Sequence, residues 1–219
     1  KLRYYQPRRV RRTEIPKDNG KMRPLGIPSI WDRLIQQCIL QILEPICEAK
    51  FHERNNGFRP YRSTQNAIAQ CYKMAQLQNL HFVVDVDIVG FFDNIDHNKL
   101  IHQLWGLGIQ DRKLIVIIKQ MLKAEILFKD IIIEPETGTP QGGILSPLLA
   151  NVVLNELDWW IAGQWEMFKV REGISGLEFP KYNSDGTFRV IDRSPKWNKL
   201  RSSTELKEMY IVRYADDFK

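Results

Sequence analysis

The sequence lacks any long hydrophobic run. No stretch approaches the roughly 18 apolar residues that span a bilayer, and Lys1–Val10 contains no apolar signal core. Cysteine is scarce, since Cys38, Cys47 and Cys71 are odd in number and show no C-x-x-C spacing. These absences argue against a membrane-spanning or secreted chain, a disulfide framework and a zinc site. We interpret the three cysteines, which lie in apolar helical patterns, as reduced core residues of an intracellular protein.

Positive charge is concentrated in one segment. Residues 1–24 hold nine of the 32 lysines and arginines against two acidic residues, Glu14 and Asp18, and the rest of the chain is close to neutral. Such a local field attracts polyanions, of which nucleic acid is the commonest; a solvated basic tail is the alternative. Residues 15–25 read as two extended pieces around an Asp-Asn-Gly turn, which predicts a basic hairpin.

Hydrophobic periodicity predicts a mixture of helices and short strands. The predicted helices span 29–47 (bent near Pro45), 63–75, 96–105, 111–123 and 146–161. The predicted strands span 81–88, 131–133 and 209–218. Residues 169–208 are polar and rich in turn-forming types, so we predict an insertion with a hairpin around 184–186.

Three carboxylates end two of these strands. Asp87 lies near the end of 81–88, and Asp216 and Asp217 end 209–218. If the strands are neighbours in one sheet, the carboxylates provide the hard oxygen ligands that Mg²⁺ prefers. A pair of metals about 3.5 to 4 Å apart can activate one oxygen and stabilise another as it leaves phosphorus. Taken singly, each of these carboxylates, and the neighbouring Asp85 as well, is better interpreted as a loop-edge group that is solvated or paired in a salt bridge.

Three segments then carry a resemblance. They read FVVDVDIVGFFDNIDH (82–97), GTPQGGILSPLLAN (138–151) and YADD (214–217). In this order they resemble successive motifs of reverse transcriptases, and their wording resembles the group II intron-encoded branch, also called maturases. Shorter matching stretches at 23–29, 32–36 and 57–60 extend the resemblance to nearly the whole chain except 169–208.

The resemblance implies an α+β fold, the right-hand polymerase, with an antiparallel palm sheet packed on helices. Residues 1–80 would form fingers. Residues 81–219 would form a palm with some fingers elements, including the Asp87 strand, the loop and helix at 138–162, the 169–208 insertion and the 214–217 turn. The chain begins without methionine and ends just after that turn, so we expect a fragment without a thumb that binds RNA but polymerises weakly or not at all.

The resemblance also implies the site. Asp87, Asp216 and Asp217 would be catalytic and would bind two Mg²⁺ ions, with the main-chain carbonyl of Ile88 adding an oxygen. Six residues would surround the incoming nucleotide: Arg11, Lys17, Arg23, Phe91, Phe92 and Gln141. The basic side chains would lie over the triphosphate, and the glutamine beside the nascent base pair. One phenylalanine would lie under the sugar and exclude a 2′-hydroxyl; the other would be core, and the sequence leaves open which. The simpler interpretations are that the basic residues are solvated charges of the hairpin and that the loop around Gln141 only gives a flexible entry to the following helix.

The implied activity is that of an RNA-directed DNA polymerase that also assists splicing of its own intron RNA. Its partners would be intron RNA, template and primer, deoxynucleoside triphosphates and, in the full-length protein, target DNA. A cytoplasmic location, bacterial or organellar, without membrane contact follows, and exposed apolar surface is compatible with a homodimer. The alternative is an RNA-binding splicing cofactor with a vestigial polymerase site. Residues 57–60 and 169–208 each have two open interpretations, a contact with RNA or a purely structural role.

Overall fold

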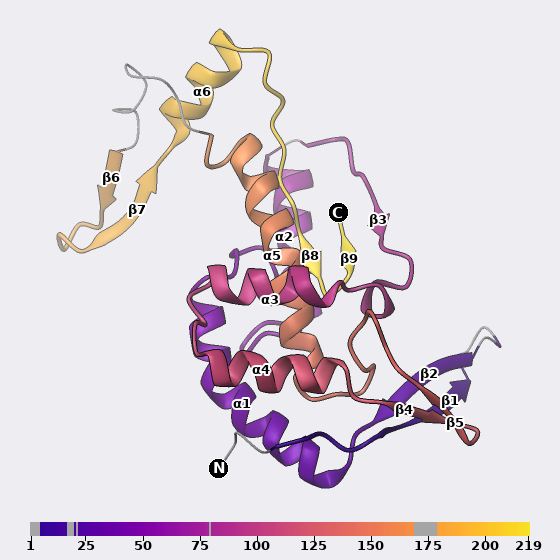
Figure 1. Cartoon of the computed structure of the whole chain (residues 1–219). Helices are drawn as coiled ribbons and strands as arrows, with labels where there is room; N and C mark the ends of the chain where they lie inside the picture. Colours follow the sequence, from indigo (N-terminus) through magenta and orange to yellow (C-terminus); the bar gives the residue numbers. More distant parts are fainter. Residues whose placement is uncertain (1–4, 17–19, 21, 79, 169–178) are drawn as a thin grey trace. The chain divides into compact units, whose positions relative to one another are not determined.

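The computed structural model describes residues 5–16, 20, 22–78, 80–168 and 179–219 (Figure 1). The backbone forms two compact units: Lys1–Glu156 with Val212–Lys219, and Leu157–Ile211. The α+β prediction is confirmed. Across the described ranges, no helix has both the length and the apolar character needed to cross a membrane.

The basic hairpin is present in the first unit. Strands β1 (Val10–Pro16) and β2 (Met22–Ile27) pair antiparallel, with Arg11 opposite Ile27 and Ile15 opposite Arg23. Most of the predicted turn lies outside the described residues. Strand β1 also runs parallel to β4 (Ile126–Phe128), which pairs with β5 (Ile131–Ile133), so the sheet order is β2-β1-β4-β5. The basic strands are therefore held within a four-stranded sheet.

The predicted helices form with small shifts at their ends. They are α1 (Ile30–Glu48), α2 (Thr64–Tyr72) with a π-helical turn at Lys73–Leu77, α3 (His97–Gly106), α4 (Arg112–Leu122) and α5 (Ser146–Gln164). Side-chain caps fix their starts: Ser29 accepts from the Asp32 amide at 3.2 Å, and Asp96 from the Lys99 amide at 2.7 Å. Helices α3 and α4 lie side by side (Figure 1).

Two strand predictions are mostly wrong. Of residues 81–88, only β3 (Val86–Asp87) is in a strand, and Phe82 is 97% exposed. Of residues 209–218, the structure pairs β8 (Arg213–Tyr214) with β9 (Asp217–Phe218) across a turn, giving the order β3-β9-β8. Strand β3 pairs with β9 at two positions, Val86 with Phe218 and Asp87 with Asp217. The core assignment of the cysteines also needs correction: Cys47 is buried, but Cys38 is exposed.

The second unit contains the predicted hairpin. Strands β6 (Phe179–Tyr182) and β7 (Phe188–Asp192) pair antiparallel, and residues 169–178 of the predicted insertion lie outside the described residues. Helix α6 (Ser194–Ser203) was not predicted, although Ser194-Pro195 is a helix-start signal. Within this unit Leu200 is buried, and the Arg201 guanidinium lies 5.9 Å from the Trp165 ring centroid.

Candidate active site

The small sheet brings together two carboxylates that are distant in sequence. Strand β3 pairs antiparallel with β9, with Asp87 directly opposite Asp217. Directly opposite residues share one face of the sheet, with Cβ atoms about 4.5 to 5.5 Å apart. Strand β8 then pairs Tyr214 with Asp217, leaving Ala215 and Asp216 in the connecting turn. Figure 1 shows β3, β9 and β8 in this order.

The opposed carboxylates have no hydrogen-bonding partner of their own. Asp87 and Asp217 are exposed, Asp216 is half-buried, and none of the three carboxylates forms a hydrogen bond or ion pair within the described part of the chain. The Lys219 ammonium interacts electrostatically with Asp217 at longer range. Asp85 differs, because the Lys219 ammonium donates to its carboxylate. That hydrogen bond raises the pKa of Lys219. Like charges directly opposite each other destabilise a strand pair, so this pair favours a bound cation.

The donors suit an open metal site rather than a closed cage. Within the described ranges, no three His, Cys, Asp or Glu side chains lie close enough to hold an ion together. Mg²⁺ is usually bound by one or two carboxylates, with waters and substrate phosphates completing its shell. An opposed carboxylate pair fits that pattern, whereas Asp216 lies in the turn beside it and Ile88 follows directly after β3.

The loop at 138–143 connects the basic hairpin with the turn after β3. The Gly26 amide donates to the Gln141 carbonyl at 2.6 Å, and the Thr139 amide donates to the Phe92 carbonyl at 2.8 Å. Gly142 has φ of 112°, and a Cβ there would lie 2.6 Å from the Gly26 carbonyl oxygen. The loop thus requires glycine at this close approach.

Two of the predicted nucleotide-binding residues meet in this loop. Arg23 Nε donates to Gln141 Oε1 at 3.4 Å, and Gln141 Nε2 donates to the Asp93 carboxylate at 3.2 to 3.3 Å. Asp93 therefore orients Gln141. The hairpin, this loop and β4–β5 line a cavity of about 470 Å³ that includes Gln141 and Asp93.

The structure separates the two phenylalanines. Both belong to the 3₁₀ turn η3 (Phe91–Asp93). Phe91 is only 8% exposed, whereas Phe92 is half-buried and packs edge-on against Phe91 at 5.5 Å and Phe58 at 6.4 Å between ring centroids. Phe91 is therefore core, and Phe92 is the ring that a ligand can reach.

The remaining basic residues of the predicted motifs differ in their burial and contacts. Arg11 is exposed on β1, and the register places it on the same hairpin face as Arg23, about 14 Å away along the strands. Lys17 lies outside the described residues. Arg59, from the 57–60 motif, is buried and donates to Glu48 at 2.8 to 3.0 Å and to the carbonyl of His52 at 2.7 Å. These contacts support the structural interpretation of that motif.

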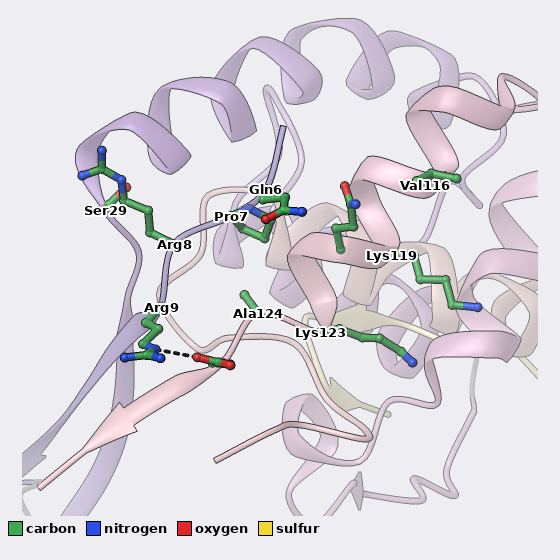
Figure 2. A pocket seen from close by; sticks show the side chains of 11 residues that line it. Gln6, Pro7, Arg8, Arg9, Ser29, Val116, Lys119, Lys123 and Ala124 are labelled. Atoms are coloured by element: carbon green, nitrogen blue, oxygen red, sulfur yellow. Dashed lines mark hydrogen bonds and ion pairs between the residues drawn. The ribbon is translucent and has the colours of Figure 1, made fainter. Parts of the chain in front are cut away.

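A second hollow, which we call the basic groove, carries a cluster of positive charge (Figure 2). Its volume is about 880 Å³, and its cationic lining residues are Arg8, Arg9, Lys119 and Lys123. Glu125 also lines it and forms an ion pair with Arg9 at 2.5 Å. Two of these cations, Arg8 and Arg9, belong to the basic segment 1–24, and the i, i+4 spacing of Lys119 and Lys123 near the end of α4 is a further sequence signal for this groove.

Comparisons with known proteins agree with this geometry. The family described as "Reverse transcriptase (RNA-dependent DNA polymerase)" matches residues 15–219. The chain is 46% identical to the group II intron-encoded protein LtrA of Lactococcus lactis, over 98% of this chain and 39% of that protein. It is 36% identical to Protein YkfC of Escherichia coli, over 98% of this chain and 54% of that protein. The chain thus spans about half or less of these relatives.

A solved structure shares the fold. Apo telomerase from Candida tropicalis matches with a TM-score of 0.58 at 14% identity, over 98% of this chain and 38% of the telomerase chain. At this identity the likeness concerns the fold alone.

Proposed function

Since the chain belongs to the reverse transcriptase family, we propose that it forms the polymerase core of a group II intron-encoded protein and copies RNA into DNA. The 46% identity to LtrA supports the group II branch. The observation that carries the proposal is the register that sets Asp87 opposite Asp217. In the proposed reaction, a primer 3′-hydroxyl attacks the α-phosphate of a deoxynucleoside triphosphate, and pyrophosphate leaves.

We assign residues 1–80 to the fingers and 81–219 to the palm with some fingers elements. Reverse transcriptases use divalent metal ions, and we propose two Mg²⁺ ions here, held by Asp87, Asp216 and Asp217 with the Ile88 carbonyl. Bound ions would activate the attacking oxygen and stabilise charge on the leaving phosphate. The chain itself contributes the opposed carboxylates, held at a fixed separation by the β3–β9 register.

The nucleotide would lie between the hairpin and the η3 turn. Arg11, Lys17 and Arg23 would neutralise the triphosphate. Gln141, oriented by Asp93 and Arg23, would border the nascent base pair. Phe92 would contact the sugar and exclude a 2′-hydroxyl, because its neighbour in η3 is committed to the core.

Intron RNA, template and primer are the proposed macromolecular partners, with target DNA in the full-length protein. The basic groove supports this, since its four cations outnumber its single carboxylate. Phosphate contacts of this kind give affinity that falls steeply with salt. We further propose a cytoplasmic, nucleic-acid-associated location, in keeping with the bacterial relatives, and self-association as a homodimer through exposed apolar residues such as Trp31 and Ile42 of α1.

Primer extension on an RNA template tests the activity in the full-length protein. We expect extension with Mg²⁺, and its loss to background in Asp87→Asn and Asp217→Asn, because each change removes one of the opposed charges. Both variants should keep wild-type affinity for intron RNA. Extension that survives both substitutions would refute the site. An inactive wild type that still binds and splices intron RNA would instead support the splicing cofactor with a vestigial polymerase site.

A further inference from the structure

Arg213 is a buried arginine directly before the carboxylate turn. Its side chain is 0% exposed, and a buried guanidinium is costly unless its donors are used. Nη1 donates to the Ala215 carbonyl at 2.7 Å and to Asn151 Oδ1 at 3.0 Å. One nitrogen thus connects the turn with helix α5.

The backbone around this arginine is fixed from a second side. The Arg213 amide donates to the Arg54 carbonyl at 3.0 Å, and the Asn56 amide donates to the Arg213 carbonyl at 2.8 Å. Asn151 Nδ2 donates to the Gly57 carbonyl at 2.8 Å, which joins the same segment to α5. A Cβ on Gly57 would overlap the backbone nitrogen of Ala215, so this segment packs directly against the turn.

The turn needs such support. Ala215 has φ of 60°, a left-handed conformation that a residue with a Cβ adopts only when its surroundings over-determine it. The carbonyl that Arg213 holds belongs to the peptide joining Ala215 to Asp216. Fixing that oxygen fixes the peptide plane, and with it the direction in which Asp216 leaves the turn and Asp217 enters β9.

We propose that Arg213, supported by Asn151, is a positioning residue that sets the affinity of the carboxylate site for divalent metal. The inference rests on the proposed function, because it assumes that Asp87 and Asp217 bind the ion. Arg213 does not contact the reacting atoms. It acts through the Ala215 carbonyl, in the way that outer partners orient metal ligands elsewhere.

The test measures Mn²⁺ binding by electron paramagnetic resonance in the full-length protein. Arg213→Lys keeps the charge but loses the planar guanidinium, and we expect its dissociation constant to rise about tenfold, the lower end for loss of an outer partner. Asn151→Ala should shift it in the same direction. The Mg²⁺ concentration for half-maximal primer extension should rise by a similar factor, with KM for the nucleotide unchanged.

A matched control separates positioning from stability. Asn155→Ala alters a buried asparagine of the same helix, which accepts from the His52 amide at 3.2 Å. We expect it to lower Tm but to leave Mn²⁺ affinity within twofold of wild type.

The outcomes are distinguishable. If wild type binds Mn²⁺, Asp217→Asn does not, and Arg213→Lys and Asn151→Ala bind like wild type, the positioning role is wrong while the proposed function stands. If Asp217→Asn binds Mn²⁺ like wild type, the metal site itself is wrong and this inference falls with it. Asn151→Ala decides the question if Arg213→Lys does not fold.

Discussion

The register between β3 and β9 predicts that repulsion between Asp87 and Asp217 lowers the stability of the metal-free protein. Asp87 lies directly opposite Asp217 and has no hydrogen-bond or ion-pair partner among the described residues, so Asp87→Asn removes a repulsion. Asp217 is less suitable for this test, because it also interacts with Lys219. For charges about 5 to 6 Å apart in a water-like dielectric, that repulsion is about 0.7 to 0.8 kcal/mol, and salt reduces it to roughly 0.5 kcal/mol. For a chain of this length, Tm in EDTA should rise by about 1 to 2 °C.

Added Mg²⁺ should make the Tm of wild type higher than that of Asp87→Asn. At ten times its dissociation constant, an ion that binds only the folded state stabilises it by about 1.4 kcal/mol, which raises the Tm of wild type by about 3 to 6 °C. Asp87→Asn, with one carboxylate removed, should gain far less. Differential scanning fluorimetry in EDTA and in Mg²⁺ measures both effects.

Asp85→Asn is the matched control, because Asp85 is two residues before Asp87 but is paired with Lys219. Losing that ion pair should leave Tm unchanged or slightly lower in EDTA, and the Mg²⁺ response should remain. The reasoning is refuted if Asp87→Asn lowers Tm in EDTA, or if Mg²⁺ raises the Tm of Asp87→Asn as much as that of wild type.

The remaining predictions concern the aromatic turn, the thiols and the second unit. Phe92→Val should raise the incorporation of ribonucleotides relative to deoxynucleotides in primer extension. Phe91→Ala should instead lower the free energy of unfolding by about 3 to 5 kcal/mol in urea titrations, without selectively changing the preference between the two sugars. A thiol reagent should label exposed Cys38 rapidly and Cys47 only on unfolding, because burial raises the pKa of the Cys47 thiol to about 12; equal labelling rates would contradict this. The hydrogen bonds from the Lys181 ammonium and from the Ser194 amide lower the pKa of Asp192 to about 2. The stabilisation that the Lys181–Asp192 contact gives the β6–β7 hairpin should therefore persist above about pH 4 and disappear as pH falls through 2, and a carboxyl NMR titration measures this.

Local signals predicted the helices well. The start of α1 follows from Ser29 with Asp32 three residues on, and the start of α3 from Asp96, because a helix cap involves residues adjacent in sequence. The hairpin of β1 and β2 was predictable for the same reason. The alternation at 81–88, by contrast, predicted a long strand, although strand length depends on a partner that the local sequence does not specify.

The sequence predicted the carboxylates of the site but not the residues that hold the site in place. The position of Asp87 and Asp217 at strand ends suggested that they meet, and the structure places them opposite each other. The burial of Arg213 had no local signal, because its acceptor on Asn151 comes from a distant helix. The role of Asp93 in orienting Gln141 was hidden for the same reason.

The loop at 138–143 has a consequence for the evolution of this protein. Its backbone is bonded to β2 through Gly26 and to the aromatic turn through Phe92, so a displacement of one is transmitted to the other. If the proposed function holds, this link couples triphosphate binding at the hairpin to sugar discrimination at Phe92. Substitutions selected in the hairpin for faster synthesis should then also change sugar discrimination, even though they lie well away from the ribose.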